Sequence, residues 1–154
     1  MTDVRGVYVH RFDVPPDAID VNGHVNNLAY LRWMQDIATA HSSACGWPLA
    51  RYLETGTSWV VRSHHVEYER PAFAGESLTA LTWIRAFGAR SSPRRYAFWR
   101  ARDRALLAKA ETMWVFVDGQ RGKPARIPDD FRSAFELVPD EKSVLQALES
   151  GALA

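Results

Sequence analysis

The feature of this sequence that most constrains its fold is a long helical pattern of apolar residues over residues 25–45. Glycine and proline are absent from it, while Gly46 and Pro48 supply stop signals directly after it. Its apolar residues recur at spacings of three, four or six, which is the pattern of a helix: Val25, Leu28, Leu31, Met34, Ile37, Ala38 and Ala44. We therefore predict one helix of about 20 residues, roughly 30 Å long. Because apolar side chains occur nearly all round it, a sheet is expected to wrap it.

Strand patterns lie on both sides of this helix, with one before it and four after it. Short connections between the later strands favour antiparallel hairpins, with turns at residues 88–93 and 103–104. The economical arrangement is an α+β fold in which a five-stranded antiparallel sheet curls around one long central helix. The predicted strands are residues 6–14, 57–68, 76–87, 94–102 and 106–117, and short helices are predicted over 48–55, over 128–137, and from an Asp140 cap to about residue 150.

Length and composition limit the class of protein. The chain has 154 residues, 47% of them hydrophobic and 24% charged, which predicts a single globular domain over residues 1–154. A net charge of +1 gives no strong field for nucleic acid or an anionic membrane, so we expect neither as a partner. One cysteine allows no internal disulfide and fits a reducing compartment. With no secretory signal pattern at the start, the sequence predicts a cytoplasmic protein.

The densest polar cluster lies where a loop enters the long helix, at residues 20–30. Asp20 can accept a proton or attack an electrophile, and Gly23 lets the backbone approach a ligand closely. Free N–H groups of the first helical turn, near Asn26 and Asn27, can bind an oxyanion. Together they form a candidate acyl-transfer site. The alternative is purely structural: Asn22 or Asn26 caps the helix, Asp20 favours its dipole, and His24 is a turn residue.

Three motifs carry a resemblance to a known family. Residues 20–33 read D-V-N-G-H-V-N-N-L-A-Y-L-R-W, residues 65–76 read H-V-E-Y-E-R-P-A-F-A-G-E, and residues 122–131 read G-K-P-A-R-I-P-D-D-F. The first motif resembles the signature of hotdog-fold thioesterases, both the 4-hydroxybenzoyl-CoA thioesterase-like acyl-CoA thioesterases and the plant acyl-ACP thioesterases. The resemblance covers roughly residues 5–136 and includes the strand–helix–four-strand order.

The resemblance implies roles for individual residues. In the bacterial hydroxybenzoyl-CoA type, the aspartate before the helix is the nucleophile or general base, and its position matches Asp20. The N–H that polarises the thioester carbonyl matches the backbone of Asn27. In the plant type an Asp, an Asn and a His are implicated, and they match Asp20, Asn22 and His24. The plant enzymes' additional glutamate falls at Pro71, which departs from the plant pattern, although Glu67 and Glu69 lie nearby.

The resemblance also implies a substrate, which is an acyl-CoA or an acyl carrier protein thioester. No cofactor is expected beyond coenzyme A as part of that substrate. Asn22, Asn26 and Tyr30 are expected to contact the substrate. In the resembling families the site forms between two subunits, and an open sheet edge with an aromatic flank likewise predicts a dimer or tetramer.

An arginine-rich segment follows at residues 85–104, with seven arginines against one acid, Asp103. The functional interpretation is a site for the phosphates of coenzyme A or for an acidic carrier protein, with Arg94 and Arg95 beside the Ser91–Pro93 turn as candidates. The alternative is a solvated strand face. His64 and His65 point to opposite faces of a strand, so no metal site is expected there. Cys45 is interpreted as a buried small hydrophobe.

Two rival functions remain open. A hotdog enoyl-CoA hydratase has its histidine five residues after the aspartate, with a proline between them. Here Asp20 and His24 are four apart with no proline, which disfavours that reading. The second rival is a non-catalytic acyl-binding module on the same fold.

Overall fold

The computed structural model describes residues 5–153 and confirms the predicted α+β arrangement. An antiparallel sheet has the strand order β1-β3-β4-β5-β2, and a two-residue strand, β6, pairs with β5. The helices are η1 (Pro16–Ala18), α1 (Asn27–Ala44), α2 (Leu49–Thr55), α3 (Asp129–Ala134) and α4 (Glu141–Glu149). The strands are β1 (Tyr8–Asp13), β2 (Thr57–Tyr68), β3 (Ser77–Ile84), β4 (Ser91–Arg100), β5 (Ala105–Asp118) and β6 (Lys123–Pro124).

The predicted long helix is α1, which begins two residues later and ends one residue earlier than expected. The Asn26 side chain accepts from the N–H of Leu28 and so caps its start. Gly46 follows the helix with φ +92°, a left-handed conformation that glycine adopts without strain. One face of α1 is buried, including Met34 and Ile37, whereas Leu28 on another face is exposed. The sheet therefore covers part of the helix and leaves the rest of its circumference open.

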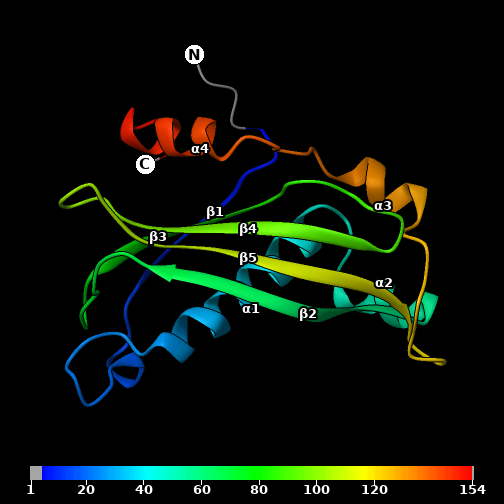
Figure 1. Ribbon diagram of the computed structural model, residues 1–154, viewed down its shortest axis with the longest axis horizontal. Coiled ribbons are helices and arrows are strands. Elements are labelled where there is room, and N and C mark those ends of the chain that lie inside the picture. Colours follow the sequence, from blue (N-terminus) through cyan, green and yellow to red (C-terminus); the bar gives the residue numbers. More distant parts are fainter. Residues whose placement is uncertain (1–4, 154) are drawn as a thin grey trace.

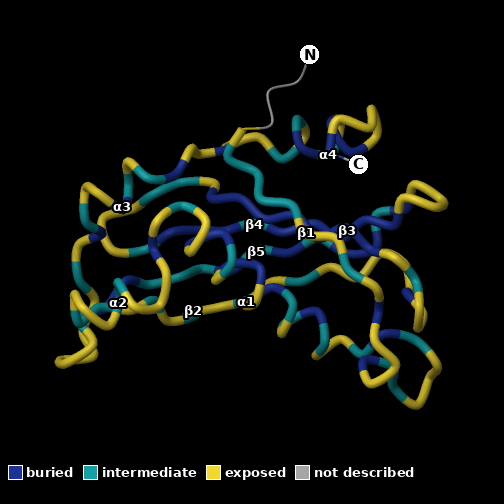
Figure 2. Tube along the Cα trace, turned by 180° about the vertical axis from the view of Figure 1, so that it is seen from behind, coloured by how far each residue is buried: buried dark blue, intermediate teal, exposed yellow. Residues whose placement is uncertain are grey.

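Each face of the sheet packs against a different helix (Figure 1). On one face the side chains of α1 pack against alternate strand residues such as Leu78, Ala80 and Phe98. On the other face, Leu81, Trp83 and Trp99 pack against α4. A third cluster, with Trp47 and Phe131, fills the end of the sheet near α2 and α3. The central strands β3, β4 and β5 are therefore the most deeply buried part of the chain (Figure 2).

The predicted turn at residues 88–93 is wrong in its second half, because Ser91, Ser92 and Pro93 already belong to β4. Proline has no N–H to donate to a neighbouring strand. It is tolerated at position 93 because its partner strand β3 ends at Ile84, which pairs with Arg94. The Pro93 carbonyl accepts from the N–H of Arg85, beyond that end. The short elements η1 and β6 were not among the predicted ones.

Strand β2 forms one edge of the sheet and is paired only on its β5 side within residues 5–153. It begins beside α2 and ends near the loop of residues 14–26 (Figure 1). A twelve-residue edge leaves a long row of backbone groups available to another strand. None of the described helices is long and apolar enough to cross a membrane.

Candidate active site

The loop of residues 14–26 folds into a small hairpin before α1. Ile19 and Val25 form an isolated antiparallel bridge, and the N–H of Asp20 donates to the carbonyl of His24 at 3.0 Å. Gly23 closes the turn with φ +86°, where a side chain would be strained. This hairpin fixes the backbone of Asp20 in the loop that leads into α1, where the N–H of Asn26 also donates to the carbonyl of Ala18 at 2.8 Å.

Among the residues that the structure describes, only one oxygen of the Asp20 carboxylate is engaged. Its Oδ1 accepts from the N–H of Asn22 at 2.9 Å, an Asx-turn contact inside the loop. Asp20 is half-buried and forms no ion pair with any residue between 5 and 153. The second oxygen, Oδ2, therefore remains available to a water molecule or a substrate.

The start of α1 presents a free backbone donor. The N–H of Leu28 is held by the Asn26 side chain at 2.8 Å, and that of Ala29 by the Asn26 carbonyl at 2.9 Å. The N–H of Asn27 donates to no acceptor in the described part of the chain, and Asn27 is exposed. An uncapped N–H at a helix start is a suitable partner for an oxyanion.

The remaining residues of the predicted cluster have mixed outcomes. Asn22 is exposed, and the His24 ring packs edge-on against Phe73, with 6.1 Å between ring centroids. Asn26, which is predicted to contact the substrate, uses its carboxamide oxygen to cap the helix. Tyr30, also a predicted substrate contact, is buried among Trp33, Tyr68 and Phe98. Its burial raises the pKa of the Tyr30 hydroxyl to about 12.

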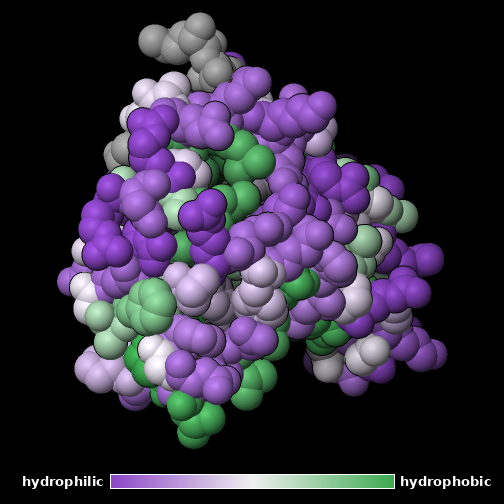
Figure 3. Space-filling model, turned by 60° about the vertical axis from the view of Figure 1, so that its left-hand side comes forward, coloured by the Kyte–Doolittle hydropathy of each residue, from purple (hydrophilic) through white to green (hydrophobic). Residues whose placement is uncertain are grey.

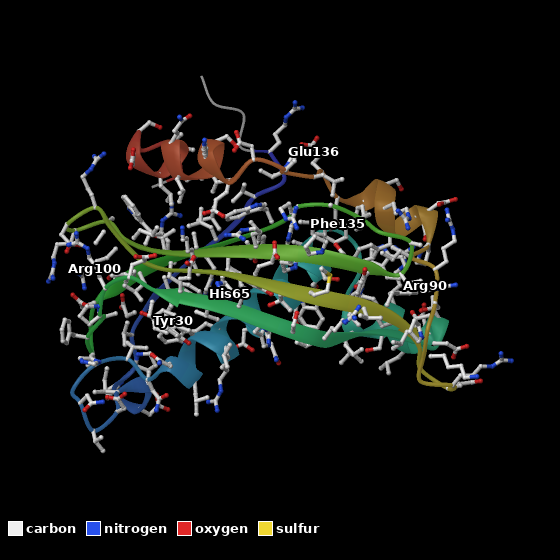
Figure 4. All side chains as sticks on the ribbon, in the orientation of Figure 1. Tyr30, His65, Arg90, Arg100, Phe135 and Glu136 are labelled. Atoms are coloured by element: carbon white, nitrogen blue, oxygen red, sulfur yellow. The ribbon has the colours of Figure 1, made fainter. Side chains whose placement is uncertain are left out.

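A buried ion-pair network braces the helix entrance. Arg100 holds Asp103 through Nε and Nη2 at 2.8 Å each, and its Nη1 donates to Glu76 at 2.9 Å and to the Pro71 carbonyl at 3.1 Å. These hydrogen bonds, to Asp103 above all, raise the pKa of Arg100 above its ordinary value. The next carbonyl, that of Ala72, accepts from the N–H of Val25 at 2.9 Å. Figure 4 shows Arg100 and Tyr30 at this end of the sheet and Arg90 at the opposite end.

Arg94 and Arg95, predicted together as a site for phosphates or for an acidic carrier protein, point to opposite faces of β4. Arg95 pairs with Glu111 at 3.6 Å and with Glu141 of α4, so its charge is already neutralised. Arg94 points toward α1 and is only 5% exposed. The other predicted arginines are largely in contacts of their own, since Arg85 and Arg102 pair with glutamates and Arg104 donates to the Glu149 carbonyl.

A cavity of about 320 Å³ lies at the end of the sheet near α2 and α3. Its wall is largely aromatic, with Trp47, Trp59, Trp114 and Phe131, and Arg94 also lines it. The part of α1 that lines it begins at Gln35, so no residue of the 20–30 cluster reaches it. Sequence reasoning missed this cavity. The high tryptophan content of the sequence is compatible with an aromatic cavity, but it does not indicate which indoles line one.

Arg94 and His41 form a buried polar pair beside the cavity. Nη1 of Arg94 donates to Nδ1 of His41 at 2.8 Å and to the Thr82 hydroxyl at 3.1 Å. Burial, and after it the charge of Arg94, lowers the pKa of His41 to about 3. His41 is therefore neutral at pH 7, with Nδ1 as the acceptor and the proton on Nε2.

The described residues contain no group of three or more histidine, cysteine or acidic side chains that could hold a metal. His64 is half-buried, with Nδ1 2.7 Å from the Thr112 hydroxyl, whereas its neighbour His65 is exposed. Cys45 lies near the end of α1, and burial raises the pKa of its thiol, which disfavours the reactive thiolate. These residues offer no chemistry to compete with the loop at Asp20.

The sequence matches the model of one protein family, described as the thioesterase-like superfamily, over residues 14–135. This region contains the 14–26 loop, α1 and the four long strands β2, β3, β4 and β5, and it begins directly after β1. A comparison with curated protein sequences finds no match.

Solved structures share the fold. A 1,4-dihydroxy-2-naphthoyl-CoA thioesterase from Synechocystis superposes with a TM-score of 0.77 at 21% identity, covering 84% of this chain and 95% of its own. A DHNA-CoA thioesterase from Staphylococcus aureus gives 0.76 at 19% identity, covering 95% of both chains. A hypothetical protein from Staphylococcus aureus in complex with CoA gives 0.81 at 14% identity, covering 92% and 94%.

The state of His41 predicts how stability depends on pH. An unfolded chain binds a proton at His41 below about pH 6.5, whereas the folded protein does not until about pH 3. Acidification through this window therefore favours unfolding, by at most about 1.4 kcal/mol per pH unit from this group. The free energy of unfolding, measured with urea between pH 7 and 4, should depend less on pH in His41→Asn than in wild type. This variant keeps an acceptor for Arg94. Equal slopes in the two proteins would contradict a neutral buried His41.

Proposed function

Because the chain belongs to the thioesterase-like superfamily, we propose that it hydrolyses an acyl-CoA thioester to a carboxylic acid and free coenzyme A. Asp20 is the general base or nucleophile, and the Asn27 N–H is the oxyanion donor. The observation that carries this assignment is the pairing of a partly free carboxylate with an open helix N–H at one loop–helix junction.

The chemistry required of these groups is modest, because a thioester is already activated. As general base, Asp20 takes a proton from water, and the resulting hydroxide adds to the carbonyl carbon. The carbonyl oxygen becomes an oxyanion that accepts from the Asn27 N–H. The C–S bond then breaks, and the thiolate leaves and takes up a proton. As nucleophile, the Asp20 carboxylate instead attacks the carbonyl carbon and displaces the thiolate of coenzyme A, which takes up a proton. Water then hydrolyses the resulting mixed anhydride to the carboxylic acid and free Asp20. His24 and Asn22 act as orienting groups in either route.

Coenzyme A, rather than a carrier protein, is the thiol carrier that we propose. The support is that similar structures are named as aryl-CoA thioesterases, and one is a complex with CoA. The acyl or aryl group is proposed to enter the aromatic cavity at Trp47, Trp59 and Trp114, whose volume suits a small organic group. We also propose a cytoplasmic location, which rests on the single cysteine.

A dimer is part of this proposal, because Asp20 and the cavity lie at opposite ends of one chain. The cavity borders the start of β2 at Ser58 and Trp59, whereas Tyr68 at the end of β2 donates to the carbonyl of Asn27 at 3.2 Å. If the exposed β2 edges of two copies pair antiparallel about a twofold axis, the end of one β2 lies beside the start of the other. Asp20 of each copy then faces the cavity of the second copy.

Exposed apolar residues at the loop end, Val21 and Leu28, are compatible with such a contact. The surface at this end is mainly hydrophilic with separate hydrophobic patches (Figure 3).

The role of Asp20 predicts the effect of removing its charge. Asp20→Asn keeps the acceptor for the Asn22 N–H but cannot take a proton, so kcat for thiol release should fall by about 10²-fold or more. Asp17→Asn is the matched control, since Asp17 is an exposed carboxylate in the preceding η1 turn, and it should retain normal turnover. Near-normal turnover of Asp20→Asn would remove Asp20 from catalysis and favour the non-catalytic alternative.

The role of the Asn27 N–H can be tested by deleting that one donor. Proline is favoured at the first helical position, and Asn26 already has the extended conformation, φ −64° and ψ 137°, that must precede a proline. Asn27→Pro should therefore fold normally but lower kcat by about 10²- to 10³-fold. Asn27→Ala, which keeps the N–H, should be close to wild type. If Asn27→Pro is folded by circular dichroism and fully active, the oxyanion donor lies elsewhere.

A further inference from the structure

Arg94 carries a buried positive charge that has no negative partner in the described part of the chain. It is 5% exposed, and its only hydrogen bonds there go from Nη1 to two neutral groups, His41 and Thr82. Burial lowers the pKa of Arg94, yet a guanidinium stays protonated in proteins. Buried charges in proteins are normally paired, so an isolated one beside a cavity indicates that the missing anion is a ligand.

The free side of the guanidinium identifies the chemistry of that ligand. Nε and Nη2 of Arg94 make no hydrogen bond within residues 5–153, and these two nitrogens form one edge with parallel donors. Arg100, six residues further along the same strand, uses the same edge to hold both oxygens of Asp103 at 2.8 Å. The edge that Arg100 fills with a carboxylate is therefore the edge that Arg94 leaves open.

The surroundings of Arg94 exclude a protein carboxylate and suit a small aromatic or apolar body. No aspartate or glutamate lines the cavity, whose wall includes Trp47, Trp59, Trp114 and Phe131. The indole N–H of Trp47 is a further buried donor, and it has no acceptor among residues 5–153. A neutral polar ligand, such as a phenol or an alcohol, would leave the charge of Arg94 uncompensated.

We propose that the cavity is a carboxylate-binding site in which Arg94 holds both oxygens of an acid carried on a small apolar or aromatic body. Two kinds of ligand could supply this carboxylate. The first, which rests on the proposed function, is an acyl group with a second carboxylate at its far end, so that the substrate is the monothioester of a dicarboxylic acid. The second is a free carboxylic acid that binds independently of a thioester. In either case Arg94 is a specificity-determining residue.

A binding measurement tests the site without any assumption about catalysis. Benzoate and its neutral isostere benzamide are titrated into the full chain, with tryptophan fluorescence as the signal because three indoles line the cavity. Wild type should bind benzoate about tenfold or more tightly than benzamide. Arg94→Met should lose this preference, while Arg90→Met, which removes an exposed arginine just before β4, should keep it. Equal affinities in wild type, or an unchanged preference in Arg94→Met, would overturn the proposal.

A kinetic measurement distinguishes the two sources of the carboxylate. Glutaryl-CoA has a carboxylate where pentanoyl-CoA has a methyl group. Wild type should prefer glutaryl-CoA by about tenfold or more in kcat/KM. In Arg94→Met the ratio of the two kcat/KM values should be near one. The same ratio in wild type and Arg94→Met, together with a benzoate preference that depends on Arg94, would assign the site to a free acid. Binding that depends on Arg94 without any thiol release would refute the proposed function and leave the carboxylate site standing. The two comparisons in wild type can be made without any variant. If Arg94→Met does not fold, Arg94→Lys replaces it, because a lysine keeps the positive charge but loses the paired donors.

Discussion

The shape of the loop before α1 depends on the charge network around the buried Arg100. The Arg100 and Glu76 side chains are each only 9% exposed, and Glu76 also accepts from the N–H of Phe73 at 2.7 Å. These contacts hold residues 71–76 in place, and the carbonyl of Ala72 in turn holds the N–H of Val25. The hairpin of Asp20 and the open N–H of Asn27 are therefore anchored to β4 through one arginine. Charged hydrogen bonds of this kind, in a poorly solvated place, restrict a polar loop that has little apolar surface to bury.

The two buried arginines of β4 have the same side chain but opposite environments. Arg100 has two carboxylates and a carbonyl around it, so its charge is satisfied by the fold. Arg94 has only a neutral histidine and a threonine, so its charge is satisfied only when a ligand enters. The first arginine shapes the site at the start of α1, and the second marks the cavity near the other end of β2. In the proposed dimer, one copy of the chain therefore contributes a different part to each of the two sites.

The sequence predicted those parts of the structure that depend on local pattern. The helix over residues 25–45 is α1 (Asn27–Ala44), because its apolar spacing and its Gly46 stop act within the segment itself. The strand over residues 57–68 has those bounds in β2. Alternation along a strand places neighbours such as Arg94 and Arg95 on opposite sides, which the prediction of one site for both residues did not take into account. It also does not reveal which side carries α1 and which carries α4. That depends on the register of β4 against β3 and β5, and on α4 supplying Glu141 to Arg95. The loop motif identified Asp20 and Asn27 as candidates, whereas the roles of Asn26 and Tyr30 are set by capping and by core packing.

The central claim is that Asp20 of one copy acts on a thioester whose acyl group lies in the cavity of another copy. Subunit complementation tests it most directly. Asp20→Asn and Arg94→Met chains are unfolded, mixed in equal amounts, refolded together and assayed with glutaryl-CoA. Random pairing makes half of the dimers mixed, and each mixed dimer has one intact site of two, so the mixture should recover about one quarter of wild-type activity. Activity no higher than the mean of the two separate variants would contradict a site shared between copies.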